Sequence, residues 1–503
     1  MSSGAQAYHQ SCIPKKWDAC AALDIPYDDV RRNDNCDHGL NVMLPMKNPQ
    51  TLTEHAKLIW QAGVDAVGSD QLVRDVVSVS QHFLTIGNDE FDLRQLSRIV
   101  VVGAGKAGAG MAAALEDVLA PEVIGQAVSK CSVSGWVNVP ADCVRPLPRI
   151  HLHAARPAGV NEPTEEGVLG SKKILELVNG LTDTDLCLVL LSGGGSALLP
   201  APVDGVSLQD KQTITRLLMH GGATINELNC VRKQLSQIKG RGLARAMPTG
   251  RMISLIISDV IGDPLDVIAS GPTVDDSSTP ADALAILSRI IPDETQIPTS
   301  ILMFLNQQAA APAVQCEVSC DRVRNLVIGN NDVAVRAAAV KAEELGYRVV
   351  NQGSGLAGVA DESGRELAEK CLSIRDSENA VSGPVCVISG GEPVVHLAET
   401  DLPRKGGRNQ ELVLAACQTL WDDGAERMAI LSGGTDGEDG PTDAAGAILD
   451  ASVVEEAKRL GLTPDEFLAI NNSYEFFDKA GGLLKTGPTH TNVMDLRVAV
   501  IGS

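Results

Sequence analysis

Short runs of apolar residues without polar alternation recur along the chain, separated by stretches with helical spacing. The clearest runs are RIVVVG (98–103), DLCLVLL (185–191) and MISLIIS (252–258), with a weaker one at VIGQAVS (123–129). Such uninterrupted runs are typical of parallel strands that are buried on both faces. Apolar positions at helical intervals lie between them, over about 106–119, 165–178 and 208–222. This alternation predicts right-handed βαβ units and a parallel sheet covered by helices.

Residues 273–322 interrupt the pattern with polar and proline-rich segments such as DDSSTP and IPDETQIPTS. A second series of alternating strands and helices follows, with expected strands at 325–329, 348–351, 385–389, 427–432 and 496–502. At 503 residues the chain is also too long for one ordinary domain. We therefore predict an α/β fold with two domains. Their expected bounds are an extension at 1–48, a larger N-terminal domain at 49–290, a linker region at 291–322 and a smaller C-terminal domain at 323–503.

Composition narrows the class of protein. The net charge of -22 argues against a nucleic-acid or membrane-surface protein, since both need a basic face. The twelve cysteines include no C-x-x-C pair and are typical of reduced thiols. No apolar run is long enough to cross a bilayer, and the first twenty residues lack the apolar core of a secretory signal. We expect a cytoplasmic protein, with a mitochondrial location less favoured.

Glycine and small polar residues follow six of the expected strands. In open α/β sheets ligands bind beyond the carboxyl ends of the strands, where glycines let backbone N–H groups converge on an anion. The repetition at six strand ends predicts a polyanionic ligand. The segments are GAGKAG (103–108), SGGGSA (192–197), SDVIGDP (258–264), GNN (329–331), SGGEP (389–393) and SGGTDGEDGPTD (432–443).

The first of these segments matches the dinucleotide pattern G-x-G-x-x-G at Gly103, Gly105 and Gly108, but it contains Lys106. A dinucleotide site also needs an acidic residue at the end of the second strand, and the expected strand ends near Val128 without one. This disfavours a dehydrogenase. An ammonium group at the start of a helix is unfavourable by itself, so Lys106 indicates an anionic partner.

A second cation and a group of acids complete the candidate chemistry. Arg408 lies in GGRNQEL at the start of an expected helix, where its guanidinium suits a phosphate or carboxylate. Asp436 and Asp439 follow a strand and suit Mg²⁺, although either is equally compatible with a local turn. Asp259, Asp263 and Glu392 are candidates for a base or a hydroxyl-positioning group. The absence of a Walker A motif means that any ATP use requires another architecture.

Several long segments resemble the class II glycerate kinases, the glycerate 2-kinase family with a MOFRL C-terminal domain. They are LSGGGSALLPAP (191–202), ATINELNCVRKQLSQIKGRGLA (223–244), LIISDVIGDPLDVIASGPT (255–273), GGRNQEL (406–412), LSGGTDGEDGPTDAAGA (431–447) and TGPTHTNVMDL (486–496). The resemblance implies a Rossmann-like N-terminal α/β/α domain, a MOFRL α/β domain and an active site in the cleft between them. It also implies phosphorylation of D-glycerate to 2-phosphoglycerate with ATP and Mg²⁺, in serine, glycine or fructose breakdown.

The resemblance assigns Lys106 and Arg408 as the active-site pair, to which we add Asp259 as a catalytic candidate. Asp436 and Asp439 are the metal candidates, and Lys233 and Asp263 are the substrate candidates. The expected nucleotide-binding residues are Gly103, Gly105, Ser192, Gly193, Gly194, Gly195, Ser196, Gly390, Gly391, Glu392, Gly434 and Thr435. The chain departs from the family pattern at HAARPAGVNEPTEEG, where Arg156 and Pro157 stand.

Two other functions stay open at this point. A nicotinamide-dependent hydroxyacid dehydrogenase acts on a similar small anion, and a non-catalytic nucleotide-binding protein would result if the altered loop at 151–163 had disabled the site. We expect small-molecule substrates rather than nucleic acid or membrane partners. No motif specifies which hydroxyl is phosphorylated or whether the chain forms a homo-oligomer.

Overall fold

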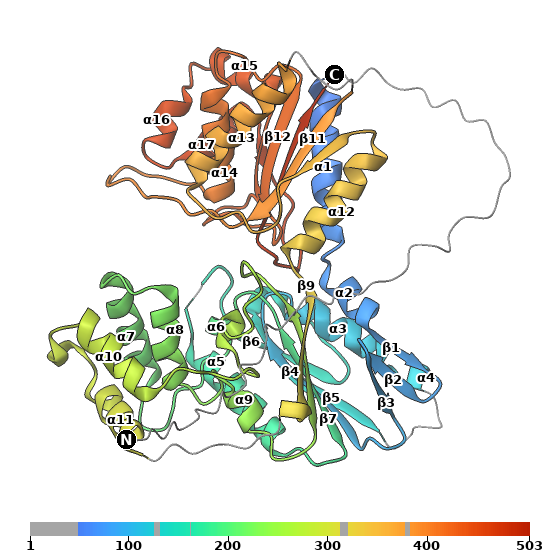
Figure 1. Cartoon of the computed structure of the whole chain (residues 1–503), viewed down its shortest axis with the longest axis vertical. Coiled ribbons are helices and arrows are strands. Elements are labelled where there is room, and N and C mark those ends of the chain that lie inside the picture. Colours follow the sequence, from blue (N-terminus) through green and yellow to red (C-terminus); the bar gives the residue numbers. More distant parts are fainter. Residues whose placement is uncertain (1–48, 125–130, 161, 312–319, 378–382, 503) are drawn as a thin grey trace, which may run out of the picture. The chain divides into compact units, whose positions relative to one another are not determined.

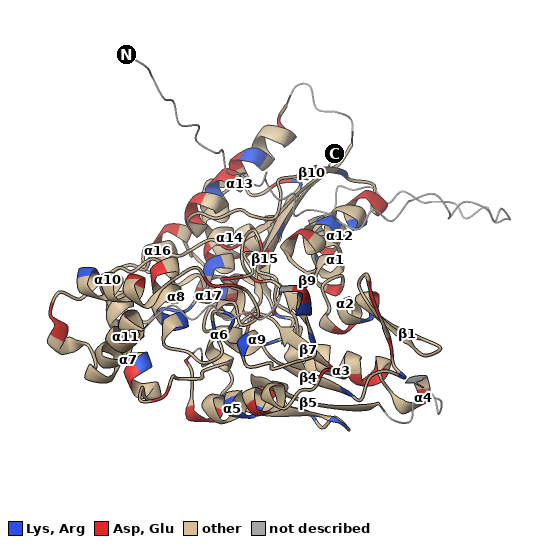
Figure 2. Cartoon of the chain, turned by 60° about the horizontal axis from the view of Figure 1, so that its bottom comes forward, with Lys and Arg blue, Asp and Glu red and all other residues tan. Residues whose placement is uncertain are grey.

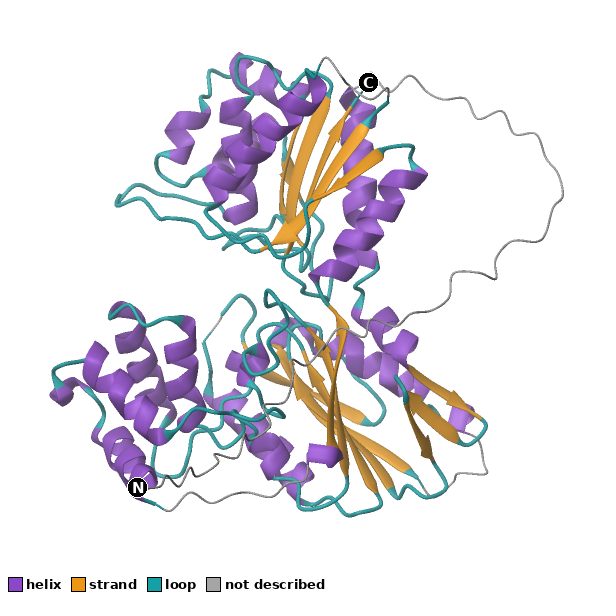
Figure 3. Cartoon of the chain, viewed as in Figure 1, coloured by secondary structure: helices purple, strands orange, loops and turns teal. Residues whose placement is uncertain are grey.

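The computed structural model describes residues 49–124, 131–160, 162–311, 320–377 and 383–502. Residues Pro45–Ser503 form one compact unit. The expected extension at 1–48 lies outside the described residues. Within them, two six-stranded sheets and a small three-stranded sheet form the framework (Figures 1 and 3).

The first sheet is parallel throughout, as the apolar runs predict, and its strand order is β6-β5-β4-β7-β8-β9. In sequence terms this is 3-2-1-4-5-6, the order of the Rossmann fold, with the topological switch point between β4 and β7. The strands are β4 (Arg98–Ala104), β5 (Ser132–Pro140), β6 (Ile150–Arg156), β7 (Asp185–Leu191), β8 (Arg251–Ile257) and β9 (Val323–Gly329).

Alternate residues of these strands pack on opposite faces of the sheet. Ile99 and Val101 join a core with the helices on one face, while Val100 and Val102 join the core on the other. Burial on both faces explains why the runs show no polar alternation. The helices are α2 (Ser69–Val76) and α3 (Gly108–Val118) on the first face, and α5 (Glu165–Asn179), α6 (Gly195–Leu198) and α9 (Gly242–Arg245) on the second.

Two smaller groups accompany the first sheet. A helical group has a core of its own and consists of α7 (Leu208–His220), α8 (Ile225–Gln234), α10 (Pro280–Ile290) and α11 (Thr299–Ala310). An antiparallel sheet that the sequence analysis did not anticipate consists of β1 (Val77–Ser80), β2 (Phe83–Ile86) and β3 (Asp89–Asp92).

The second sheet is mixed rather than parallel, with the order β10-β11-β15-β12-β13-β14. The final strand β15 lies antiparallel between β11 and β12, which therefore run in the same direction. The strands are β10 (Arg348–Asn351), β11 (Val385–Gly391), β12 (Met428–Gly434), β13 (Gly446–Leu449), β14 (Leu483–Leu484) and β15 (Asp495–Ile501).

Helices cover both faces of this second sheet as well. The helices α1 (Pro49–Asp65) and α12 (Asn331–Glu344) pack on the face that includes Cys386. The other face packs against α13 (Ala360–Arg375), α14 (Arg408–Thr419), α15 (Ala451–Arg459) and α17 (Ser473–Ala480), with α16 (Pro464–Leu468) beside α14 and α17. In Figure 2 charged residues lie mainly on outer helices such as α5 and α13, and the strands are mostly uncharged.

Two elements pack differently from what the expected domain bounds imply. Helix α1, assigned by position to the N-terminal domain, packs on the second sheet through Ile59 and Trp60. Strand β9, expected to open the C-terminal series, instead pairs with β8 at the edge of the first sheet. The domain bounds remain a prediction, but the chain crosses between the sheets at both of these elements.

Candidate active site

The carboxyl ends of β4, β7 and β8 bring three of the expected glycine-rich loops together. A Cβ atom on Gly105 would lie 2.0 Å from the Ser192 Oγ, and one on Gly193 would lie 2.5 Å from the Asp259 Oδ2. The Lys106 backbone N–H donates to the Gly193 carbonyl at 2.9 Å. The absence of side chains at Gly105 and Gly193 therefore allows the loops to meet at the switch point.

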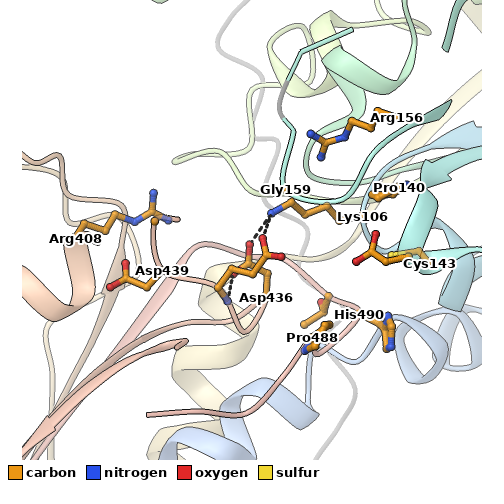
Figure 4. Close-up of a pocket in the computed structure, with 14 residues that line it drawn as sticks. Lys106, Pro140, Cys143, Arg156, Gly159, Arg408, Asp436, Asp439, Pro488 and His490 are labelled. Carbon is orange, nitrogen blue, oxygen red and sulfur yellow. Dashed lines mark hydrogen bonds and ion pairs between the residues drawn. The ribbon is translucent and has the colours of Figure 1, made fainter. Parts of the chain in front are cut away.

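A pocket of about 300 Å³ contains residues from both series of elements. Lys106 and Arg408 both line it, together with Asp436 and Asp439. Figure 4 shows the Lys106 side chain directed at Asp436, with Arg408 reaching the same pocket from α14. The lining also includes residues without an assigned role: Pro140, Asp142, Cys143, Arg156, Gly159, Glu438, Gly440, Pro488, His490 and Thr491.

Lys106 is held by two acids of the loop that follows β12. Its Nζ donates to the Asp436 Oδ2 at 3.0 Å and to the Glu438 Oε2 at 3.1 Å. Burial opposes the charged form of Lys106, but the attraction of these carboxylates outweighs it and raises the pKa of the ammonium group. Lys106 is therefore a cation that reaches the pocket while paired with partners that can be exchanged for a ligand.

Arg408 is held more firmly. Its Nε and Nη2 donate to the two carboxylate oxygens of Asp495 at 2.7 and 3.0 Å, and its Nη1 donates to the Glu392 Oε1 at 2.8 Å. The Asp495 side chain has 0% exposure. A bidentate pair with a buried carboxylate fixes the position of the guanidinium. Despite burial, the pKa of Arg408 is raised by Asp495 and Glu392.

The two metal candidates have different surroundings. Asp439 is 2% exposed, and its two oxygens accept the backbone N–H groups of Asn409 and Gln410 at 3.0 and 2.9 Å. It therefore caps the start of α14, and burial raises its pKa to about 7. Asp436 instead accepts from Lys106 and from the Glu438 backbone N–H at 3.1 Å, the turn interaction considered from the sequence. In the described part of the chain, no group of three or more His, Cys, Asp or Glu side chains is arranged to hold a metal ion.

Asp259 lies beside this pocket without lining it. Burial, followed by the negative charge of Glu392, raises its pKa to about 6. Its Oδ2 accepts from the Asn492 Nδ2 at 3.4 Å. Burial also raises the pKa of Glu392, against the opposing effect of Arg408.

The glycine-loop residues of the first sheet have mainly packing contacts. A Cβ on Gly103 would lie 2.0 Å from the Leu190 carbonyl oxygen, and Gly194 adopts a φ of +78°. The Ser192 Oγ accepts from the Ala107 N–H at 3.0 Å, across the same junction. Gly195 begins α6, and the Ser196 Oγ lies 2.6 Å from the Ser270 Oγ.

The expected nucleotide-binding residues of the second sheet are also closely packed. Cβ atoms on Gly390, Gly391 and Gly434 would lie 1.8 Å from the Asn331 Oδ1, 2.1 Å from the Leu356 carbonyl oxygen and 2.6 Å from the Glu438 carbonyl oxygen. Thr435 is 0% exposed and donates through its Oγ1 to the Met494 carbonyl at 2.6 Å. These residues shape the loops, and their contact with a nucleotide remains a prediction.

The two substrate candidates contact other groups. The Nζ of Lys233 lies 3.4 Å from carboxylate oxygens of both Asp266 and Asp276. Asp263 accepts from the Asn330 Nδ2 at 2.6 Å. Neither Lys233 nor Asp263 lines the pocket of Lys106 and Arg408.

The placement of the second strand near 123–129 was wrong. Residues Pro121–Ile124 form helix α4, residues 125–130 lie outside the described part of the chain, and β5 occupies Ser132–Pro140. The argument against a dehydrogenase from a missing acid therefore fails, because Asp142 follows β5 and lines the pocket. The first half of β5 mixes exposed and half-buried residues, so it lacks the continuous apolar run used to find the other strands.

Sequence reasoning also missed Asp495, the buried partner of Arg408. It stands immediately before the apolar run of the last strand, and nothing in the local sequence distinguishes it from a surface acid. Its position beside Arg408 depends on the insertion of β15 between β11 and β12, which pairs residues far apart in sequence.

Comparison with known proteins identifies relatives along most of the chain. Residues 55–306 match the family model described as a domain of unknown function, DUF4147, and residues 385–495 match the MOFRL family. A glycerate kinase of Bos taurus is 38% identical, with alignment over 90% of this chain and 93% of the relative. A D-glycerate 2-kinase of Thermotoga maritima is 36% identical, over 91% of this chain and 100% of the relative.

Solved structures agree with the sequence comparison. A crystal structure of glycerate kinase from Thermotoga maritima superposes with a TM-score of 0.75 at 36% identity, over 90% of this chain and 100% of that one. Its similarity supports the two-domain α/β fold predicted from the sequence. Identity at this level along nearly the full length of several relatives establishes that the chain belongs to the glycerate kinase family.

Proposed function

We propose that this chain is a glycerate 2-kinase, which transfers the γ-phosphoryl group of ATP to the 2-hydroxyl group of D-glycerate. The observation that carries the proposal is the shared pocket of Lys106, which lies in the loop after β4 of the first sheet, and Arg408, which begins α14 beside the second sheet. Phosphoryl transfer needs alignment and charge neutralisation more than covalent help from the protein. Two cations that face one pocket provide such neutralisation, and family membership supplies the substrate class.

Lys106 is the residue that would follow the transferred group. Its ammonium group pairs with Asp436 and Glu438, whose side chains are 17% and 47% exposed. Phosphoryl oxygens can replace these partners because an ammonium is a flexible point charge with three donors. Arg408, locked to Asp495, would instead present a fixed guanidinium to the nucleotide or to the developing negative charge.

Asp436 and Glu438 are the residues that would hold Mg²⁺. Their carboxylates reach the pocket, whereas both oxygens of Asp439 accept backbone N–H groups. Protein-bound Mg²⁺ takes one or two carboxylates together with water and phosphate oxygens, so the small donor set fits. When bound, the ion supplies neutralisation of the phosphate charge.

Asp259 is the candidate base for the acceptor hydroxyl. A pKa of about 6 leaves it mainly ionised at neutral pH and able to take a proton. Its contact with Gly193 places it at the junction of the three loops beside Lys106. We therefore assign Asp259 to the acceptor side of the site.

A second pocket of about 610 Å³ shares Arg408 and Gly440 with the first. Pro393, Val394 and Leu397 line it. Val394 and Leu397 are 56% and 65% exposed and give this pocket an apolar surface on which a base could pack. We place the nucleotide base against these residues, so that its phosphates extend past Arg408 towards Lys106.

Product analysis tests the proposal. The chain is incubated with ATP, MgCl₂ and D-glycerate, and the products are followed by phosphorus NMR, which distinguishes 2-phosphoglycerate from 3-phosphoglycerate. We expect ADP and 2-phosphoglycerate in equal amounts, and a much lower rate of formation of both from the Lys106→Met variant. Formation of 3-phosphoglycerate would contradict the regiochemistry, and absence of ATP consumption would contradict the kinase assignment.

The part of the chain that the structure describes has no helix long and apolar enough to span a membrane. The cytoplasmic location and the absence of nucleic-acid partners stay predictions. Asp142 in the pocket does not specifically favour the dehydrogenase, because its carboxylate can accept a hydrogen bond from a ribose hydroxyl or pair with a cation.

A further inference from the structure

Three cationic side chains gather in the N-terminal half without a carboxylate partner. They are Lys211 on α7, Arg232 on α8 and Lys239, which follows α8. Lys211 and Lys239 are only 8% and 4% exposed. Among the described residues, no ion pair involves any of the three. After burial, the charges that act on Lys239 are those of Lys211 and Arg232, so the three groups form one electrostatic cluster.

The hydrogen bonds of the cluster are incomplete. The Nζ of Lys239 donates to the Ser196 carbonyl oxygen at 2.9 Å, to the Ser196 Oγ at 3.0 Å and to the Ser270 Oγ at 3.4 Å. All of these acceptors are neutral. The buried Nζ of Lys211 has no hydrogen-bond partner within the described structure. Donors are thus present in excess of acceptors.

This arrangement is energetically unfavourable in the absence of a ligand. A buried ammonium group without a partner costs several kcal/mol, and like charges nearby add to the cost. Burial, followed by repulsion from Arg232, lowers the pKa of Lys211 to about 7. Lys233 gives the contrast, because this neighbouring buried lysine has both Asp266 and Asp276 as partners. Lys233 on α8 therefore has carboxylate partners, whereas among the described residues the three cations of the cluster have none.

Lys239 of the cluster contacts the same loop, 192–196, that Lys106 contacts. Gly193 accepts the Lys106 backbone N–H, and a Cβ on Gly194 would lie 3.6 Å from the Lys106 side chain. Ser196, two residues further on, is the partner of Lys239. Ser270, the other partner, has a left-handed φ of +62°, and such backbone is held only where the surrounding structure fixes it. The 192–196 loop therefore connects the two cationic groups.

We propose that Lys211, Arg232 and Lys239 form a second anion site, behind the 192–196 loop, that binds a small oxyanion group. The Arg232 guanidinium can donate two parallel hydrogen bonds to a carboxylate or phosphate, and Lys211 supplies an ammonium donor that has no other partner. The low exposure of both lysines restricts the site to a compact group. The bound oxyanion is either the carboxylate of the acceptor substrate or a phosphate of the nucleotide. Steady-state kinetics can distinguish the two, and that distinction rests on the proposed function.

A thermal-shift experiment tests the site without any enzyme activity. It uses the Lys106→Met variant as background, which removes the main cation of the first pocket, and compares sodium phosphate with sodium chloride at equal ionic strength. We expect phosphate to raise the Tm of the single variant Lys106→Met. It should have little effect on the Tm of the double variant that also carries Lys211→Met. In chloride, the second substitution should keep or raise the Tm, because it removes an unpaired buried charge. An equal phosphate-induced rise in both proteins, or no rise in either, would overturn the site.

Steady-state kinetics identify the source of the oxyanion. Arg232→Gln should raise one KM roughly ten- to a hundredfold, the loss expected for a charge-assisted hydrogen bond. A rise for D-glycerate identifies the acceptor carboxylate, and a rise for ATP identifies a nucleotide phosphate. Arg232→Lys should recover part of the loss. Unchanged KM values for both substrates would overturn the proposal.

The exposed Arg216 on α7 provides the matched control. Arg216→Gln removes the same charge from the same group of helices, and we expect both KM values and the phosphate response to stay as in the wild type. If the wild-type chain does not phosphorylate glycerate, the proposed function fails. The thermal-shift comparison then still decides whether the anion site exists.

Discussion

Lys106 and Arg408 line one pocket but are held in opposite ways. Lys106 contacts two partly exposed carboxylates of a loop, and Arg408 forms a bidentate pair with an acid of 0% side-chain exposure. The first cation can exchange its partners for a ligand, and the second is fixed in place before any ligand arrives. The contrast indicates that a phosphoryl-transfer site can combine one adjustable charge with one preorganised charge.

Removal of the partner of the fixed cation should have the largest effect. Asp495→Asn removes the buried carboxylate and leaves the Arg408 guanidinium with Glu392 as its remaining carboxylate partner, and breaking a pair with a buried acid costs about 3–5 kcal/mol. We expect this loss in the free energy of unfolding, measured by chemical denaturation. Asp495→Asn combined with Arg408→Gln should recover stability but not activity. A single variant as stable as the wild type would contradict the fixed role of Arg408.

Removal of the adjustable cation should affect activity rather than stability. Lys106→Met deletes a charge that acts on the transferred group, and we expect kcat to fall by about 10²–10³ or more. Its ion pairs are partly exposed and worth about 0–1 kcal/mol, so the Tm should change little. Wild-type kcat in a folded Lys106→Met protein would remove Lys106 from the mechanism.

The two aspartates near these cations should separate into a structural and a ligand-binding residue. Asp439→Ala leaves the Asn409 and Gln410 N–H groups without acceptors, which should lower the free energy of unfolding by about 1–3 kcal/mol. Asp436→Asn should leave the Tm nearly unchanged and raise the Mg²⁺ concentration needed for half-maximal rate. The same Mg²⁺ dependence in Asp436→Asn as in the wild type would exclude Asp436 as a ligand.

The pH dependence should show the smallest effect. If Asp259 must be ionised to accept a proton, kcat/KM falls as the pH drops through about 6, its raised pKa. Glu392→Gln removes one negative charge that raises this pKa, so the acidic limb should move to lower pH. The comparison uses kcat/KM of both proteins from pH 5 to 8. If the acidic limb of kcat/KM lies at the same pH in both proteins, ionisation of Asp259 does not cause it.

Much of the fold was predictable because burial on both faces leaves a clear pattern. The strand at 185–191 was predicted at the bounds found for β7, in which every residue is buried. The β5 strand was misplaced because its exposed first half has no such run. The pairing of β9 with β8 and the insertion of β15 depend on contacts far apart in sequence, which local patterns do not encode.

The candidate site was predictable to a similar extent. Lys106 and Arg408 were found because a cation at the start of a helix indicates an anionic partner, and Asp436 was found because an acid after a strand suits Mg²⁺. All three line the pocket. Asp495 and the cation cluster were missed because their significance depends on burial. Lys233 was selected as a substrate candidate, and only the structure shows that its charge is already paired.

The central claim is that the adjustable and the fixed cation act on the same phosphoryl group. A double-mutant cycle with Lys106→Met and Arg408→Lys tests it most directly, since Arg408→Lys keeps the charge beside Asp495. Groups that act as a unit give strongly non-additive losses, so kcat of the double variant should be close to that of the slower single variant. Losses in kcat that multiply would contradict the claim, because they would show that the two cations act independently.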